Sequence, residues 1–218
     1  MSRLRVLHRA SDCVPAKKIS FAVTVYISEF SRNASCGTLG KPPSYGAARG
    51  RRRMSMDKIV IGRALLTDVD GILKLAEANH ASRGGSLTGT LCREAVSETV
   101  AAIPSVVARS GGNLIGFLLA WEKEPSNFPW IEAMLNAYSG ADNAYIYGPI
   151  CVDSLARGRG IAGAMFAELR RLLPGREGIL FIRGDNEASL RAHRKLGMSQ
   201  KAEYVYEGST FVVLAYDG

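Results

Sequence analysis

The chain has 218 residues, which is room for one domain with an appendage or for at most two small domains. Its hydrophobic content of 47% and charged content of 22% are ordinary for a globular protein, and no apolar run reaches the length of a membrane span. Of the net charge of +8, residues 1–55 carry eleven of the 28 basic and two of the 20 acidic residues, so residues 56–218 are near neutral and give no electrostatic reason to expect nucleic-acid binding.

Residues 1–55 differ from the remainder of the chain. They are rich in arginine and poor in acids, and they end in a basic run at residues 47–53, just before Met54 and Met56. Three interpretations stay open: an extension outside the domain, including an over-long reading frame that truly starts at Met54 or Met56; an organelle-targeting peptide; or a basic arm for nucleic acid or acidic lipid. We favour the first, and we expect one domain over residues 56–218 preceded by a disordered or non-domain extension at 1–55.

The cysteines show neither a metal-binding pattern nor a disulfide pattern. Cys13, Cys36, Cys92 and Cys151 form no Cys-x-x-Cys pair and have no histidine at zinc spacing. We therefore expect free thiols in a reducing compartment, a cytoplasmic protein and no bound metal.

The first half of the domain alternates strand and helix patterns. Thr67 is a candidate helix cap, and Gly111-Gly112 marks a hairpin turn. The patterns predict a strand over Asp57–Leu65, a helix from Thr67, a flexible loop over 82–90, a helix over Leu91–Ala102, strands over Val106–Arg109 and Leu114–Trp121, and a short helix over Trp130–Tyr138 within the long 122–142 connection.

The second half contains a strand-helix-strand unit and a closing hairpin. Pro149 cannot donate to a strand ladder, so we expect an interruption at Gly148-Pro149. The predicted elements are strands over Ala144–Val152 and Gly178–Arg183, helices over Gly160–Leu173 and from Asp185 or Asn186 to Leu196, and strands over Ala202–Tyr206 and Thr210–Tyr216. This order predicts a mixed α/β fold with an antiparallel flank and a central βαβ unit.

The connection after Val152 is the most informative segment. Glycines at 158 and 160 let backbone amides approach an anion, the following helix offers its unpaired N–H groups, and Arg157 and Arg159 add positive charge. Together they predict a diphosphate site.

Two other interpretations of this segment stay open. It could be a glycine-rich surface turn, or a dinucleotide fingerprint of the form G-x-G-x-x-G through Gly163, with Asp185 as the ribose ligand. Against the fingerprint, five residues separate Val152 from Gly158, and too few residues follow for a doubly wound fold. A P-loop is excluded because no Lys-Ser/Thr closes the loop.

In these residues the chain resembles the GNAT superfamily of N-acetyltransferases. The family signature Arg/Gln-x-x-Gly-x-Gly/Ala is matched by Arg157, Gly160 and Ala162. The segment 186–198 resembles a second family block, Asn-x-x-Ala…Tyr-x-Lys-Leu-Gly-Phe. The resemblance covers about residues 57–216 and implies a mostly antiparallel twisted sheet of about seven strands, with a splayed parallel pair and about four flanking helices.

The resemblance also implies a mechanism. The pantetheine arm of acetyl-CoA would lie between the strands 144–152 and 178–183, and an amine would attack the thioester directly. A backbone N–H of the bulged strand would stabilise the oxyanion. The cofactor-binding residues would be Ile150, Cys151, Val152, Arg157, Gly158, Arg159, Gly160, Ile161, Ala162, Gly163, Asn186, Ser189 and His193.

One position departs from the family pattern. His193 stands where the family commonly has the tyrosine that protonates the leaving thiolate. An imidazole, with a pKa of about 6.5, is mostly neutral at pH 7. His193 is therefore a candidate general acid, and the alternative is that it contacts cofactor or solvent without transferring a proton.

The remaining candidates are less specific. For the general base, the sequence offers a water chain or one of His80, Glu94, Glu132 and Asp142. Tyr145 and Tyr147 are candidates for the acceptor pocket or for the core, and Cys151 is expected to pack rather than to act as a nucleophile.

The expected function is transfer of an acetyl group from acetyl-CoA to a small-molecule or peptide amine. A CoA- or nucleotide-binding sensor without turnover and a dinucleotide-dependent oxidoreductase are the alternatives. We expect no nucleic acid and no membrane as partners of the domain, and the sequence is compatible with a homodimer.

Overall fold

The computed structural model describes residues 58–83, 85, 87, 89–123 and 128–218. The predictions for residues 1–55 lie outside the described residues. Within the described residues, seven strands form one sheet in the order β1-β2-β3-β4-β5-β7-β6. The strands are β1 (Ile59–Arg63), β2 (Val106–Ser110), β3 (Asn113–Glu122), β4 (Tyr145–Val152), β5 (Gly178–Arg183), β6 (Ser199–Tyr206) and β7 (Ser209–Tyr216).

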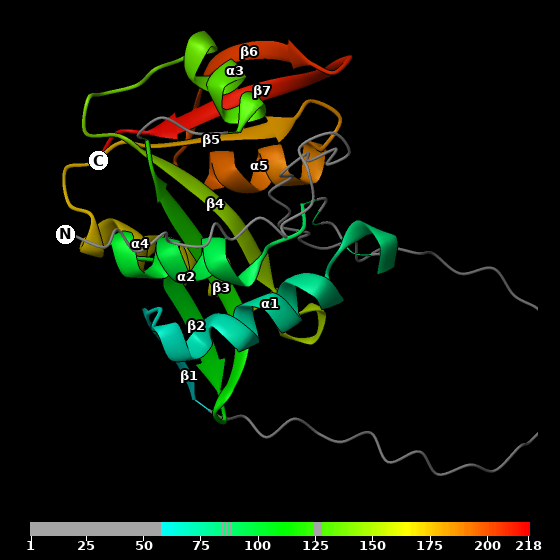
Figure 1. The fold of residues 1–218 in the computed structure, drawn as a ribbon, viewed down its shortest axis with the longest axis vertical. Helices are drawn as coiled ribbons and strands as arrows, with labels where there is room; N and C mark the ends of the chain where they lie inside the picture. The colour runs from blue at the N-terminus through cyan, green and yellow to red at the C-terminus, as the bar shows by residue number, and fades with distance from the viewer. Residues whose placement is uncertain (1–57, 84, 86, 88, 124–127) are drawn as a thin grey trace, which may run out of the picture.

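Five α-helices in the described part of the chain cover the two faces of this sheet (Figure 1). They are α1 (Val69–Ala78), α2 (Arg93–Ala102), α3 (Pro129–Ala137), α4 (Ile161–Leu172) and α5 (Glu187–Lys195). One face carries α1 and α2 over β2–β4 and α3 over β5–β7, whereas α4 and α5 lie on the other face. None of the helices in the described ranges is both long and apolar enough to cross a membrane.

The sheet is antiparallel except at its centre. Of the six pairings between the strands that the structure describes, only β4 with β5 is parallel, and it is limited to Tyr145 opposite Gly178 and Ile146 opposite Ile179. Beyond these two pairs the strands diverge, which Figure 1 shows as a V between β4 and β5. The predicted mixed fold and the splayed pair are therefore confirmed. A doubly wound dinucleotide fold, which needs a largely parallel sheet, is not formed.

The interruption predicted at Gly148-Pro149 is also present. Pairing of β4 with β3 passes from Ile150 opposite Leu118 directly to Tyr147 opposite Ala120, so Gly148 and Pro149 fall outside the regular register. The indole Nε1 of Trp121 donates to the carbonyl of Gly148 over 2.7 Å and holds this irregular segment. The bulge therefore shapes β4 at the level where the strands diverge.

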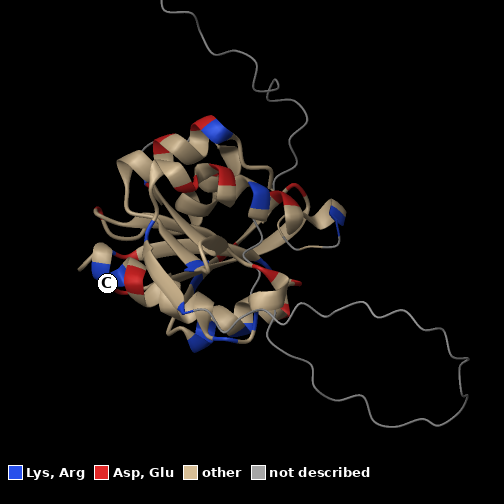
Figure 2. Ribbon diagram, turned by 90° about the horizontal axis from the view of Figure 1, so that it is seen from below, with Lys and Arg blue, Asp and Glu red and all other residues tan. Residues whose placement is uncertain are grey.

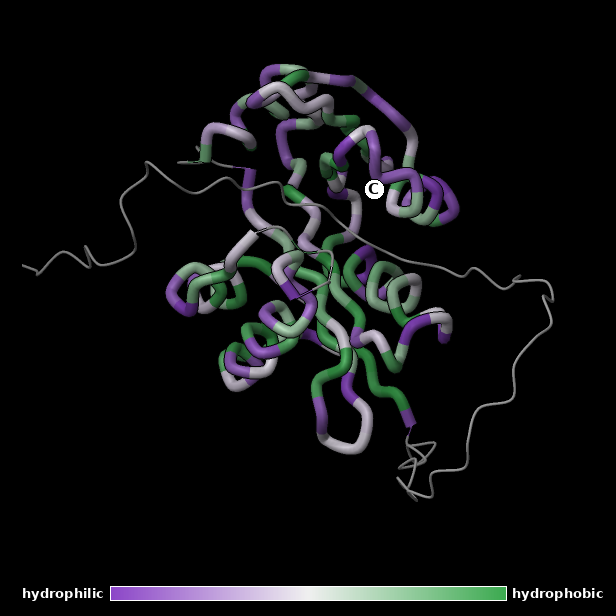
Figure 3. The backbone as a smooth tube through the Cα atoms, turned by 90° about the vertical axis from the view of Figure 1, so that its right-hand side faces the viewer, coloured by the Kyte–Doolittle hydropathy of each residue, from purple (hydrophilic) through white to green (hydrophobic). Residues whose placement is uncertain are grey.

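The core lies on both faces of the sheet, between the strands and the helices that cover them. Figure 3 shows the hydrophobic positions concentrated in the central strands, and Figure 2 shows basic and acidic residues interspersed over the molecule. Phe117, Leu118 and Leu119 are all fully buried because β3 is covered by helices on both faces. The core therefore fixes α4 against β1–β3 and presents its N-terminal end beside the end of β4.

The segment 82–90, predicted as a flexible loop, has no α-helix or named strand among its described residues. It includes part of a 3₁₀ turn at Ala81–Arg83, and Leu87 pairs with His80 in an isolated bridge. Leu87 is buried because it packs into the cluster under α1 and α2. Because Gly84, Gly85 and Gly89 are typical of a loop, the local sequence pattern did not predict the contact of Leu87 with the core.

Replacing Gly178 with alanine is expected to destabilise the fold by about 1–3 kcal/mol, because the new methyl group overpacks the core. A Cβ there would lie 2.4 Å from Cε1 of Tyr216 and 3.0 Å from Cζ of Tyr145. Gly62→Ala is the control, since a Cβ at Gly62 meets nothing within 4 Å. Urea unfolding of both variants measures the effect, and equal stabilities would contradict the packing argument.

Candidate active site

The connection from β4 to α4 is built in two steps. A 3₁₀ turn at Ser154–Ala156 follows the strand, and the carboxylate of Asp153 accepts a hydrogen bond from the Leu155 N–H at 2.8 Å. Ala156 is fully buried and anchors the turn in the core. The chain then runs through residues 157–160 to the first residue of α4. The sequence pattern did not predict this turn, although an Asp before Ser is a usual capping signal.

Two glycines give the connection its shape. Gly158 and Gly160 both have φ of +72°, in the left-handed region that L-residues with side chains rarely adopt. A Cβ at either position would meet nothing within 4 Å, so this side of the loop is open. The first N–H groups of a helix have no partner within it, and here those belong to Ile161, Ala162 and Gly163. The loop and the helix start therefore present unpaired amides at the positive end of the helix dipole.

The two arginines of this loop have different surroundings. Arg157 is half-buried: its Nε donates to the Val152 carbonyl over 3.1 Å, and its guanidinium donates to Oδ1 of Asn79 over 2.7 Å. Arg159 is exposed and has no hydrogen bond or ion pair to any residue that the structure describes. Arg157 thus ties the loop to the end of α1, and Arg159 is the side chain available to an anion.

The edge of β4 that faces β5 is open over most of its length. From Tyr147 to Val152, β4 pairs with β3 but has no strand partner on its other side within the described part of the chain. Ile150, Cys151 and Val152, predicted to pair with the cofactor arm, lie on this stretch. An extended ligand can therefore add to this edge as a strand would.

Helix α5 faces the same splay and begins at a buried cap. Oδ1 of Asn186 accepts from the Ser189 N–H at 3.1 Å, and both residues are buried. The capping of α5 was predicted from sequence, whereas the hydrogen bond from Asn186 to the cofactor arm stays a prediction. The helix places Asn186, Ser189 and His193 together on its buried face.

His193 is fully buried, with 0% of its surface exposed. Its Nδ1 lies 2.8 Å from the Ser189 carbonyl oxygen, which can only accept, so Nδ1 carries the proton. Burial lowers the pKa of His193 to about 4, and the ring is neutral at pH 7. Its Nε2 is therefore an unprotonated acceptor, a state that disfavours a role as proton donor.

Tyr147 is the nearest aromatic neighbour of His193 on β4. The two rings meet edge to face with centroids 5.7 Å apart, and Tyr147 also meets Phe166 of α4 edge to face. Tyr145 points to the same face but hydrogen-bonds the hydroxyl of Tyr216. Tyr145 therefore packs in the core, as expected for at least one of the two tyrosines.

Cys151 lies on the opposite face of β4, in the cluster under α1 and α2. Burial raises the pKa of its thiol to about 12, so the thiol stays protonated at pH 7. Both observations favour the expected packing role over that of a nucleophile.

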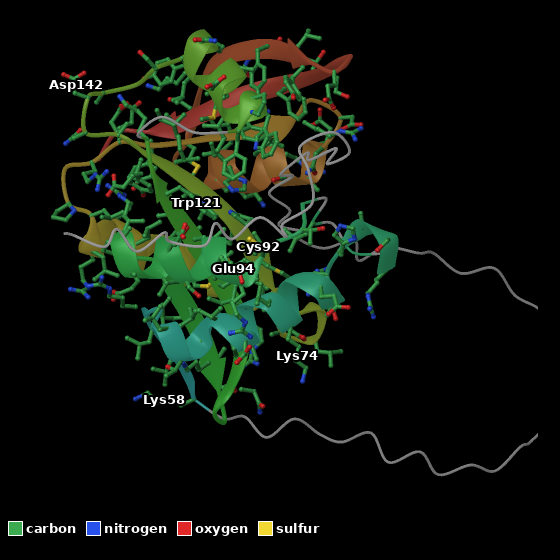
Figure 4. The ribbon with its side chains drawn as sticks, in the orientation of Figure 1. Lys58, Lys74, Cys92, Glu94, Trp121 and Asp142 are labelled. Atoms are coloured by element: carbon green, nitrogen blue, oxygen red, sulfur yellow. The ribbon has the colours of Figure 1, made fainter. Side chains whose placement is uncertain are left out.

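The carboxylates considered as general bases do not share one site. Glu94 is exposed on α2, whereas Asp142 lies at the far side of the sheet, before the start of β4 (Figure 4). Glu132 is exposed on α3, and Nδ1 of His80 contacts the Ser82 hydroxyl at 2.8 Å.

Sequence reasoning missed Asn79 and Trp121. Asn79 is buried directly after α1, and its Oδ1 accepts the hydrogen bond from Arg157. Trp121 stabilises the bulge by donating a hydrogen bond to the carbonyl of Gly148. An asparagine at a helix end and a tryptophan in a strand are both common, so neither residue stands out in the sequence. Their hydrogen-bond partners lie far away along the chain and are identified only by the structure.

Comparison with known proteins gives a consistent result. The profile of the Acetyltransferase (GNAT) family matches residues 86–198, just over half of the chain. No curated protein matches the sequence.

Solved structures share the fold at low sequence identity. A GNAT-family acetyltransferase from Streptococcus agalactiae aligns with a TM-score of 0.57 and 18% identity, over 73% of this chain and 95% of its own. A ribosomal-protein-alanine N-acetyltransferase from Brucella melitensis gives 0.55 and 19%, over 73% and 99%. The yncA protein of Salmonella typhimurium, solved with its cofactor acetyl-CoA, gives 0.53 and 17%, over 73% and 94%.

Proposed function

Because the chain belongs to the Acetyltransferase (GNAT) family, we propose that it transfers an acetyl group from acetyl-CoA to a primary amine by direct attack in a ternary complex. The observation that carries the proposal is the anion cradle at the start of α4, formed by Gly158, Arg159, Gly160 and the first amides of the helix. An open amide surface beside an unpaired guanidinium suits a diphosphate.

The rest of the acyl carrier would run along the edge of β4 from Tyr147 to Val152, which has no strand partner on the β5 side among the described residues. Asn186 and Ser189 of α5 are buried, and their contact with the carrier stays a prediction. We assign the pantetheine arm to this path, with Ile150, Cys151 and Val152 as backbone partners. Arg157 acts by holding the loop through Val152 and Asn79.

Binding both reactants side by side in the ternary complex would supply much of the rate acceleration through proximity. A backbone N–H at the irregular segment of β4 would stabilise the oxyanion. The relatives that act on ribosomal-protein alanine suggest that a protein N-terminus belongs in the acceptor panel beside small amines.

The experiment is a thiol-release assay with acetyl-CoA and a panel of small amines, amino acids, aminoglycosides and peptides with free N-termini. We expect amine-dependent release of thiol with at least one acceptor class, and an acetylated product by mass spectrometry. Binding of CoA without turnover on any acceptor would favour the sensor alternative, and no binding of CoA at all would overturn the proposal.

A further inference from the structure

The backbone N–H groups of β4 do not keep one regular alternation along the strand. In a regular strand, successive N–H groups point in turn to the two edges. At the start of β4, the Tyr145 N–H donates to the Glu177 carbonyl, on the β5 side, over 2.9 Å. After its end, the Asp153 N–H donates to the Ile115 carbonyl, on the β3 side, over 2.9 Å. Ile150 lies three residues before Asp153 in regular register, so its N–H points the other way, to the open edge.

The bulge is what gives Ile150 this direction. From Ile150 to Tyr147 the pairing advances three residues on β4 but two on β3, so β4 carries one extra residue. Without that residue, the alternation that starts at Tyr145 would assign the open edge to Pro149, which has no N–H. Ile150 therefore supplies the first backbone N–H after the interruption that is directed to the open edge.

Trp121 holds the peptide unit that precedes this donor. Its indole Nε1 donates to the Gly148 carbonyl over 2.7 Å, and that carbonyl belongs to the peptide between Gly148 and Pro149. Gly148 has φ of +101°, in the region that favours glycine. The next peptide along the chain carries the Ile150 N–H. The indole therefore acts on the orientation of that N–H across a single residue.

The indole is itself fixed from two sides. Trp121 is half-buried, and it packs against both the cluster under α1 and α2 and the cluster under α3 (Figure 4). Its backbone pairs with Ile146 of β4, so the side chain reaches along the strand to the bulge. An oxyanion donor is effective when its direction is set before the reaction, because no reorganisation is then needed. A packed side chain bonded to the bulge meets this requirement.

We propose that Trp121 is a positioning residue for acetyl transfer, which directs the N–H of Ile150 at the carbonyl oxygen of the bound acetyl group. This inference rests on the proposed function. As the amine nitrogen bonds to the acyl carbon, a carbonyl electron pair moves to oxygen, where the Ile150 N–H stabilises the charge. The C–S bond then breaks with its electron pair on sulfur, and the proton that the amine loses balances the one that sulfur gains. Trp121 keeps its own proton and acts only through the bulge.

The test removes the indole N–H and keeps the shape of the side chain. Trp130→Phe leaves Trp121 as the single tryptophan of the chain, so expression with benzothienylalanine then exchanges this one N–H for sulfur. The single-turnover rate at saturating acetyl-CoA and amine should fall about tenfold, part of the hundredfold to thousandfold that an oxyanion donor contributes. Affinity for coenzyme A, which has no acetyl group, should change by less than about twofold in titration calorimetry.

Trp130→Phe with ordinary tryptophan is the matched control, because Trp130 lies on α3 and stacks on Phe128. Its rate should stay close to that of wild type, and Trp121→Phe should reproduce the loss in rate. A sulfur-substituted protein that transfers acetyl as fast as the control would overturn the positioning role. So would a loss in rate matched by an equal loss of coenzyme A affinity, which a general displacement of β4 would cause. A wild-type protein that acetylates no acceptor would instead count against the proposed function.

Discussion

Replacing Gly160 with aspartate is expected to weaken coenzyme A binding by about a hundredfold or more, while leaving the fold about as stable as before. At roughly 5 Å and an effective dielectric constant near 20, a carboxylate and one phosphate charge repel by about 3 kcal/mol. Aspartate tolerates the left-handed region better than most residues, and its charge suits a helix N-terminus, so the stability should change by no more than about 1 kcal/mol. Calorimetry gives the affinity, and urea unfolding gives the stability.

Two control variants separate charge from shape and from location. Gly160→Asn has nearly the size and backbone tolerance of the aspartate but no charge, and we expect its affinity to stay much closer to that of wild type. Gly208→Asp places the same charge at another glycine with positive φ and open surroundings, in the turn between β6 and β7. Equal losses for Gly160→Asp and Gly160→Asn would show that repulsion of a bound anion is not the cause.

Acid is expected to destabilise the fold through His193. In the unfolded chain this histidine takes up a proton near pH 6.5, whereas in the folded state its pKa is about 4 because the ring is buried. The unfolded state therefore binds more protons between pH 6.5 and 4, and stability is lost as the pH falls through this window. The full loss is about 3 kcal/mol, of which about 2 kcal/mol arises by pH 5.

The measurement is the free energy of unfolding in urea at pH 7 and at pH 5, for wild type and for His193→Gln. The variant has no titrating group at this position, so its loss between the two pH values should be smaller by about 2 kcal/mol. Identical losses in the two proteins would mean that His193 is not held neutral by burial.

Local patterns were sufficient to predict most of the elements. The helix that starts after Asn186, the strand Gly178–Arg183 and the interruption at Pro149 all depend on residues within a few positions of one another, and the structure confirms them. Capping, hydrophobic period and the missing N–H of proline are short-range effects. The residue patterns predicted each of the five α-helices of the described residues, whereas the family resemblance implied about four.

The contacts of the site residues could not be predicted from local sequence patterns. The partner of Arg157 is Asn79, which lies 78 positions earlier in the chain, and no local pattern pairs them. The neutral state of His193 depends on its burial beside Tyr147 of β4, so the sequence left open whether His193 is a general acid or only contacts cofactor or solvent. The contact between the two rings likewise depends on how α5 packs against β4.

Hydrogen–deuterium exchange with and without coenzyme A is the sharpest test of a diphosphate site at the start of α4, because it locates the bound diphosphate on individual amides. We expect exchange to slow at the amides of residues 158–163 when coenzyme A is added. Saturating coenzyme A that leaves these amides unchanged, or that protects a different surface, would contradict a diphosphate site there.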